Sequence, residues 1–187
     1  FVTCGHELSS ILDFKIRATT AVLNARIIPR LGKLISDLER VLQRLEIQAP
    51  IVVVKGDGTL MAAEMAKHRP VETIFSGPAA SAIGGRFLSG RANALVIDVG
   101  GTTTDLALVD ELKVTLSEDG ARVGKFKTAV KAARIRTAGM GGDSRIFIDA
   151  DGGVRVGPER VVPLSRLAAL FPQVKKEIAG LKKKREL

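Results

Sequence analysis

Residues 96–109, VIDVGGTTTDLALV, place two aspartates and three threonines around a pair of glycines. The apolar runs at 94–97 and 106–109 predict two strands joined by a tight turn. Gly100 and Gly101 permit the positive φ that such a turn uses, and without a Cβ they let the backbone approach a ligand closely. The spacing therefore predicts a hairpin whose turn can bind an anion.

The polar residues of this stretch are suited to phosphate and to a cation. The hydroxyls of Thr102 and Thr103 add donors to the backbone amides of the turn, and both can point at anionic oxygens. Asp98 can orient a hydrated Mg²⁺, and Asp105 lies on the second strand. We therefore predict a phosphate-binding hairpin with catalytic carboxylates at Asp98 and Asp105. The alternative is an ordinary hairpin whose threonines and aspartates merely suit its turn.

A second glycine-rich loop, GMGGDS, follows about forty residues later, at 139–144. Its glycines give the backbone access to a ligand, and its Asp or Ser can contact a metal or a water. The two loops can face the same phosphate chain from opposite sides; the alternative for this loop is a turn capped by its Asp. The candidate residues of the loop are Gly139, Gly141, Gly142, Asp143 and Ser144.

A third candidate is the segment SGP at 76–78. Ser76 is predicted to cap a helix, with Pro78 at an early helical position. The free amides at this helix start, around Ser76 and Gly77, can bind an anion. Capping, together with close packing of the small residues at 77–85 on a sheet, explains the segment equally well without a ligand.

The composition bounds the class of protein. The chain has 187 residues, 45% of them hydrophobic, and no apolar run approaches the roughly 20 residues that cross a bilayer. We therefore expect a cytoplasmic protein that does not enter a membrane. The net charge is +9, but Trp and Tyr are absent and the phenylalanines are not interleaved with the basic clusters, so we expect no nucleic-acid partner. Cys4 is the one cysteine of the sequence, and His6 and His68 are its two histidines, so we expect neither a disulfide within the chain nor a complete Cys/His zinc site.

Helical and strand patterns alternate along the chain. Residues 14–47 predict two helices broken at Pro29, the second with an apolar stripe that we expect in the core. The stripe consists of Leu31, Leu34, Ile35, Leu38, Val41, Leu42 and Leu45. Strands are predicted at 51–55, 71–75, 113–116, 121–126 and 134–137 and in a hairpin that turns at 149–153, and helices at 60–67, at 77–85 and from Pro163 onward with breaks near Pro172 and Gly180. These patterns predict an α/β domain with antiparallel hairpins and flanking helices.

Several separated blocks carry a family resemblance. They are GHEL at 5–8, RATTAVLNARIIP at 17–29, VVKGDGTLM at 53–61 and RPVETIFSGPAASAIGG at 69–85, followed in order by the two glycine motifs. Over about residues 1–160 the chain resembles the hydantoinase A and 5-oxoprolinase family, within the actin, sugar-kinase and heat-shock-chaperone ATPase superfamily. Residues 161–187 are interpreted as a basic helical segment outside this ATPase domain.

The resemblance implies a ribonuclease H-like mixed sheet, part of an actin-like ATPase fold, that uses ATP and Mg²⁺. It implies that Asp98 holds Mg²⁺ through water, that the turn at 100–103 holds phosphate, and that the loop at 139–144 closes over the nucleotide. Members hydrolyse hydantoins or 5-oxoproline after phosphorylation of the carbonyl oxygen, some with a second enzyme subunit, and relatives carboxylate ketones. The alternatives are a ketone carboxylase subunit, an ATP-sensing or chaperone-like member without catalysis, and a basic nucleic-acid-binding module that rests on charge alone.

Two departures from the family pattern bear on these expectations. An earlier Asp-Gly-Gly-Thr hairpin of an N-terminal lobe is not found before Phe14, so we expect a fragment with half a nucleotide site that is catalytically silent alone. In the later loop, Met140 and Asp143 stand where many relatives have the smaller residues of GAGGGS. We assign His6, in the GHEL block, no firm role.

Overall fold

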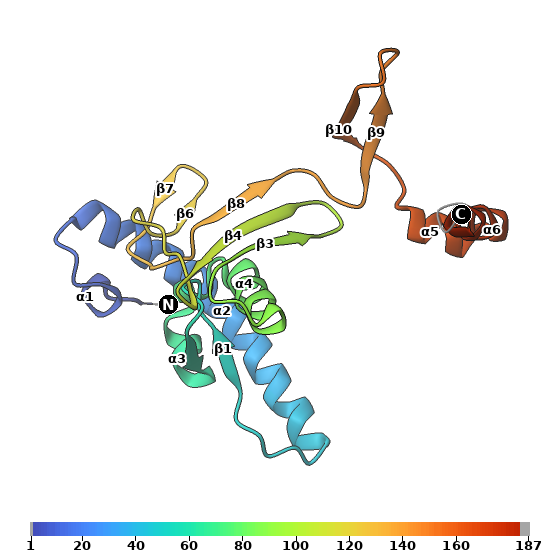
Figure 1. The fold of residues 1–187 in the computed structure, drawn as a ribbon. Coiled ribbons are helices and arrows are strands. Elements are labelled where there is room, and N and C mark those ends of the chain that lie inside the picture. The colour runs from blue at the N-terminus through green and yellow to red at the C-terminus, as the bar shows by residue number, and fades with distance from the viewer. Residues whose placement is uncertain (1, 184–187) are drawn as a thin grey trace. The chain divides into compact units, whose positions relative to one another are not determined.

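The computed structural model describes residues 2–183, the last three by their backbone alone, and divides into two compact units (Figure 1). The first unit comprises the residues up to 96 and 106–135, and the second comprises 97–105 and the residues from 136 onward. The chain is a mixture of helices and antiparallel strands, which confirms the predicted class. None of the described helices is long and apolar enough to cross a membrane.

The elements follow one another along the chain with short connections. The helical elements are α1 (Gly5–Leu8), α2 (Phe14–Arg44), α3 (Ala63–His68), the 3-10 turn η1 (Pro70–Thr73), α4 (Ser76–Ser89), α5 (Leu164–Leu170) and α6 (Pro172–Lys183). The strands are β1 (Val52–Val54), β2 (Leu60–Ala62), β3 (Ala94–Val99), β4 (Thr104–Asp110), β5 (Lys113–Val114), β6 (Arg122–Val123), β7 (Phe126–Lys127), β8 (Ile135–Ala138), β9 (Ser144–Ile148) and β10 (Val154–Arg160).

Strand β4 is the centre of the largest sheet, because it pairs with β3, β5 and β8. The pairs β1 with β2, β6 with β7, and β9 with β10 are separate antiparallel two-stranded ribbons. The predicted hairpin around 149–153 is confirmed, with Val154 opposite Ile148. The sheet thus supports the turn between β3 and β4, and the chain leads from β8 to β9 through the second glycine loop.

Helix α2 is a single helix of 31 residues, so the predicted break at Pro29 is wrong. The Asp13 side chain caps its start by accepting hydrogen bonds from the amides of Lys15 and Ile16. A proline inside a helix removes one hydrogen bond and crowds the preceding turn. Here both halves of α2 pack on other elements of the first unit, the N-terminal half on α1 and η1 and the C-terminal half on α3. This packing keeps the helix continuous.

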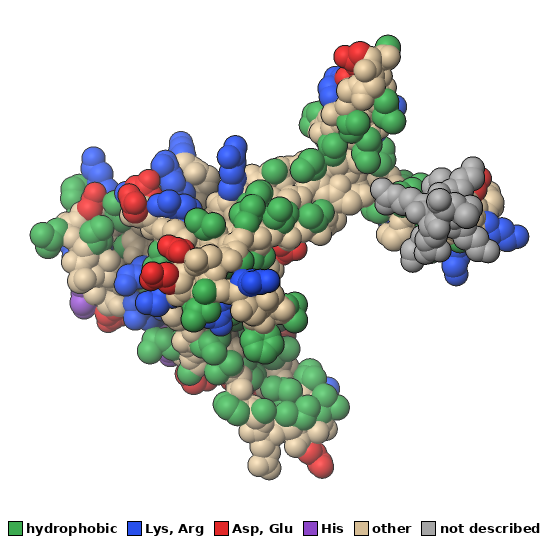
Figure 2. Space-filling model, viewed as in Figure 1, with side chains coloured by type: hydrophobic (Ala, Val, Ile, Leu, Met, Phe, Trp, Pro, Cys, Tyr) green, Lys and Arg blue, Asp and Glu red, His purple; other side chains and the backbone are tan. Residues whose placement is uncertain are grey.

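The predicted apolar stripe of α2 is only partly core. Ile35 is 2% exposed and packs with Met61, Ala63 and Ala66, with Leu31 beside them. The neighbouring side of the stripe is exposed instead, as the hydrophobic side chains near the C-terminal end of α2 show in Figure 2. These exposed residues are Leu34, Leu38, Val41 and Leu45.

Three further element predictions are corrected. The helix expected from Leu60 begins only at Ala63, because β2 occupies the residues before it and pairs with β1. The strand expected at 71–75 is η1, followed by a turn. Its Pro70 fixes φ at the start of that turn, and the buried Val71 donates its amide proton to a side chain of α2 rather than to a strand. The break expected near Gly180 is also absent, because Gly180 lies inside α6, whereas α6 does begin at Pro172 as expected.

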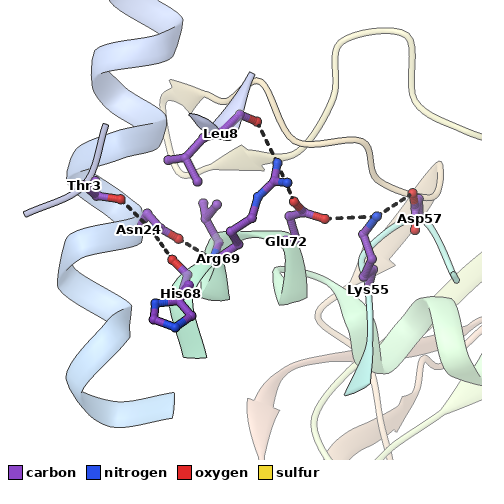
Figure 3. A network of polar contacts seen from close by, with 9 residues as sticks. Thr3, Leu8, Asn24, Lys55, Asp57, His68, Arg69 and Glu72 are labelled. Carbon is purple, nitrogen blue, oxygen red and sulfur yellow. Dashed lines mark hydrogen bonds and ion pairs between the residues drawn. The ribbon is translucent and has the colours of Figure 1, made fainter. Parts of the chain in front are cut away.

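Buried Asn24 of α2 connects this helix to α3, to η1 and to the segment before α1 (Figure 3). Its Nδ2 donates to Thr3 Oγ1 and to the His68 carbonyl, both at 2.9 Å. Its Oδ1 accepts the proton of the Val71 amide at 3.0 Å. All of its polar atoms are therefore satisfied, which makes a buried amide stabilising rather than costly.

The apolar core belongs to the first unit. Every buried hydrophobic residue among those described lies there, and two clusters of such residues form around Ile35 and around Val71. In the second unit the buried residues among those described are polar, Thr104 and Ser144. The second unit is therefore held mainly by hydrogen bonds and ion pairs, which are the contacts that form the candidate site.

Candidate functional site

The residues Gly100–Thr103, named here the strand turn, connect β3 to β4. The Gly100 amide donates to the Thr103 carbonyl at 2.8 Å and closes the turn. Neither Gly100 nor Gly101 has a positive φ, so the predicted conformational reason for these glycines is wrong. Gly101 instead leaves an open side, because a Cβ built on it meets no atom within 4 Å.

The residues Gly139–Ser144, named here the glycine loop, pack directly on the strand turn. The Gly142 amide donates to the Gly100 carbonyl at 3.0 Å, and the Asp143 amide donates to the Gly101 carbonyl at 2.8 Å. A Cβ on Gly141 would lie 2.7 Å from backbone atoms of Gly101 and Thr102. The two motifs therefore form one surface in contact and do not enclose a phosphate chain from opposite sides at this point.

Thr104, which the sequence analysis did not single out, fixes the start of the glycine loop. Its side chain is 5% exposed, and its Oγ1 donates to the Met140 carbonyl at 2.7 Å. The Ser144 hydroxyl is likewise used within the loop, where it accepts the proton of the Gly141 amide at 2.9 Å. The third threonine of TTT and the serine of GMGGDS thus shape the loops, whereas Thr102 is exposed and Thr103 half-buried.

The two predicted catalytic carboxylates lie on different strands of the hairpin. Asp98 is exposed on β3, and the half-buried Asp105 on β4 accepts a hydrogen bond from the Thr137 hydroxyl of β8. Within the described part of the chain, no three His, Cys, Asp or Glu side chains lie close enough together to hold a metal. A cation at Asp98 would therefore take most of its ligands from water and from a bound anion.

Arg160, at the end of β10, links the two loops and was also missed. Arg160 lies opposite Ser144 across the β9–β10 ribbon, and this register brings the Arg160 side chain to the loops. Its Nη1 donates to the Thr102 carbonyl at 2.8 Å and forms an ion pair with Asp143 Oδ1. The Asp143 side chain is 19% exposed and that of Arg160 is 43% exposed. Asp143 is thus bound through both its backbone and its side chain.

The third candidate segment begins α4 in the first unit. Ser76 is the first helical residue rather than the cap, since Phe75 occupies the cap position with a left-handed backbone and no side-chain hydrogen bond is made there. The predicted cap is therefore wrong. The anion-binding role of Ser76 and Gly77 stays a prediction.

A polar hollow of about 410 Å³ lies in the first unit, beside the KGDG turn. Lys55 lies between Glu72, at 2.9 Å, and Asp57, at 3.6 Å, and Glu72 also binds Arg69 (Figure 3). Burial disfavours the charged form of Lys55, but hydrogen bonds and charge from Glu72 and Asp57 outweigh it and raise the pKa of Lys55. The exposed His6 of the GHEL block lies at the wall of this hollow. Because these charges pair with one another, the cluster has a complete structural explanation.

The family model described as hydantoinase/oxoprolinase matches residues 17–165, which include the strand turn, the glycine loop and Arg160. The chain belongs to the hydantoinase/oxoprolinase family. The alpha subunit of caprolactamase from Pseudomonas jessenii is 29% identical to this chain over 161 residues, an alignment that covers 84% of this chain and 23% of that subunit. The chain thus spans about a quarter of the length of this curated relative.

This hydantoinase/oxoprolinase chain also shares its fold with a solved structure of nucleotide-free acetone carboxylase, from a study of ATP-dependent acetone carboxylation. The TM-score is 0.63 at 21% identity, and the match covers 83% of this chain and 22% of that one. At this identity the likeness establishes the fold alone.

Proposed function

We propose that the strand turn and the glycine loop form the phosphate-binding part of a nucleotide site in an ATP-dependent enzyme that activates a cyclic amide. The observation that carries this proposal is the close packing of Gly141 on Gly101 and Thr102. That packing fixes the backbone of the turn from one side, while the open side of Gly101 remains accessible to a ligand. A fixed, glycine-lined backbone with free donors is what phosphate recognition requires.

The residues present fit a nucleotide phosphate with Mg²⁺. Within the second unit, the described hydrogen bonds leave the amides of Gly101, Thr102 and Thr103 without an acceptor. These amides and the threonine hydroxyls donate to phosphate oxygens, and Asp98 orients the water shell of the cation. Gly139 and Gly142 are proposed as further members of the site, and Asp105, which accepts a hydrogen bond from Thr137, is proposed as its second carboxylate.

ATP, when bound, supplies the phosphoryl group that turns the carbonyl oxygen of a cyclic amide into a better leaving group. The chain itself contributes position and charge. The strand turn would hold phosphate oxygens in a fixed orientation, and the Asp98 carboxylate would orient a hydrated Mg²⁺, whose positive charge neutralises them. The contacts between the loops keep these donors in place, so the turn need not reorganise during the reaction.

The cyclic amide is favoured over a ketone by the family description and by the caprolactamase relative, whose name denotes a lactam. A ketone carboxylase subunit is the second candidate, supported by the fold shared with acetone carboxylase. Because the curated relative is named a subunit alpha, we further propose that a second subunit takes part in the reaction. A ribonuclease H-like, actin-like lobe and a cytoplasmic location complete the proposal.

The test is ATP turnover by the whole protein, measured with and without hydantoin, 5-oxoproline, caprolactam or acetone with bicarbonate. A rise in turnover with a cyclic amide, lost in Asp98→Asn, supports the proposal. A rise only with acetone and bicarbonate favours the carboxylase. Nucleotide binding with a conformational response but no effect of any substrate favours an ATP sensor.

A further inference from the structure

Arg160 is the one charged side chain, among those described, that contacts both loops of the candidate site. Both of its recorded bonds use Nη1, to the Thr102 carbonyl and to Asp143. A guanidinium has five N–H donors in a rigid plane, so its Nε and Nη2 donors are left over. Within the second unit these two nitrogens bond to no other described residue.

The surroundings of this guanidinium suit an anion. It bonds to the carbonyl of Thr102, an exposed residue of the strand turn next to the open position at Gly101. Its side chain is 43% exposed, so its remaining donors are accessible from solvent, whereas its partner Asp143 is 19% exposed. Neutral donors of the turn and a cation therefore lie side by side, which is the combination that binds phosphate most strongly.

We propose that Arg160 is a phosphate-binding residue of this site, that the Thr102 carbonyl holds its guanidinium beside the strand turn, and that the Asp143 carboxylate competes with phosphate for that guanidinium. The proposal rests on the proposed function, because it assigns a further residue to the same nucleotide site. Asp143 then acts through Arg160 and does not bind the ligand or a metal. Its negative charge close to the phosphate opposes binding, and this separates the roles of the two partners.

A purely structural role for the ion pair predicts something else. If Arg160 only joined the loops, loss of either partner would loosen the same contact, and both losses would weaken phosphate binding equally. If Arg160 binds phosphate, loss of Arg160 weakens binding, whereas loss of the Asp143 charge strengthens it. The sign of the Asp143 effect therefore decides between a phosphate ligand and a simple clamp.

The experiment is calorimetric titration of the full chain with Mg·ADP, with pyrophosphate and with adenosine, for the wild type and for Arg160→Gln, Arg160→Lys, Asp143→Asn and the double variant Arg160→Gln with Asp143→Asn. We expect Arg160→Gln to weaken Mg·ADP and pyrophosphate binding about tenfold or more and adenosine binding not at all. Arg160→Lys restores part of the affinity because it keeps the positive charge. Asp143→Asn tightens binding a few-fold, because it removes a negative charge that repels the phosphate. The matched control is Arg155→Gln, which removes another β10 arginine from its ion pair with Asp149.

Equal weakening by Arg160→Gln and Asp143→Asn, with no further loss in the double variant, overturns the proposal in favour of a clamp. So does wild-type affinity in Arg160→Gln, which leaves the nucleotide site itself intact. If the wild type binds neither Mg·ADP nor pyrophosphate, the proposed function is overturned as well. This outcome is distinguishable from the two above, in which the wild type binds. Amide spectra of each variant verify folding, and Arg160→Lys carries the test if Arg160→Gln does not fold.

Discussion

Gly141 lies so close to the strand turn that only a hydrogen fits in place of its side chain. A Cβ there would meet backbone atoms at 2.7 Å, and backbone cannot rotate out of the way as a side chain can. We therefore expect Gly141→Ala to destabilise the second unit by about 2 kcal/mol or more and to separate the loops. Thermal unfolding measures this, with Gly139→Ala as the control, because a Cβ on Gly139 meets nothing within 4 Å. Equal melting temperatures for the two variants would contradict the described packing.

Thr104 is expected to matter for the glycine loop through its hydroxyl alone. Thr104→Val keeps the shape but removes the donor to the Met140 carbonyl, which costs about 1–2 kcal/mol. Thr104→Ser keeps the donor and is the matched control. Urea unfolding followed by a probe in the second unit compares them, and a valine variant as stable as the serine variant would show that this bond contributes nothing.

The ion pairs of Lys55 predict how the first unit responds to acid. Burial raises the pKa of Asp57, but hydrogen bonds from Thr59 and the charge of Lys55 outweigh it, so the pKa of Asp57 lies below its ordinary value. A carboxylate with a lowered pKa stabilises the fold above its ordinary pKa and loses this effect as pH falls through its folded pKa. We expect the melting temperature to fall below about pH 4 and Asp57→Asn to flatten that fall. An unchanged acid slope in the variant would exclude Asp57 as its source.

At this scale the sequence indicated which residues carry donors but not which donors are used up inside the protein. Asp98, Thr102 and Thr103 could be singled out because they stand next to glycines in one motif. Thr104 and Arg160 could not, since their acceptors lie 36 and 58 positions away in the chain. Asp143 was identified, but its ion pair depends on the β9–β10 register, which a sequence pattern does not fix.

Among the elements, α2 provides the sharpest test, because a proline lies within its 31 residues. Pro29→Ala restores a backbone donor and relieves crowding, so we expect it to stabilise the chain by about 1 kcal/mol or more, less the entropy that proline removes from the unfolded chain. Circular dichroism during urea unfolding measures it, with Gly32→Ala, an open position in the same helix, as the comparison. A destabilised Pro29→Ala variant would mean that the proline ring packs usefully in the folded state.

The periodic pattern of α2 predicted a helical region and its buried Ile35 correctly, but not the exposure of Leu34 or Leu38. Periodicity shows which face of a helix is apolar, but it does not show how much of that face neighbouring elements cover. The run at 71–75 was misassigned for a different reason. Short apolar runs suit several conformations. Here the hydrogen bond from the Val71 amide to Asn24, 47 positions earlier in the chain, favours the turn.

On the scale of the whole molecule, the two units differ in what stabilises them. The first unit has an apolar core, whereas the second has polar contacts and a β9–β10 hairpin with one face of exposed aliphatic residues (Figure 2). These are Ile146, Ile148, Val154 and Val156. We expect amide protons of the second unit to exchange faster than those around Ile35 and Val71, and hydrogen exchange by mass spectrometry measures this. Equal protection in both units would show that they unfold as one.

The class and the family could be read from the sequence, because both depend on local patterns and on motifs in order. The division into two units could not, since the boundaries fall inside strands β3, β4 and β8, where no composition changes. The sequence allowed candidate residues for the site to be named, but it did not indicate how the two loops are arranged. Two loops expected to face each other across a ligand turned out to rest on one another, leaving one open side.

Amide NMR of the ¹⁵N-labelled chain decides whether this open side of the strand turn binds phosphate. On titration with Mg·ADP to millimolar concentration, we expect the amide signals of Gly101, Thr102 and Thr103 to shift. The shifts should be largest there and much smaller in Asp98→Asn. Shifts confined to other parts of the chain, or none in the strand turn at saturating nucleotide, would contradict phosphate binding at this side.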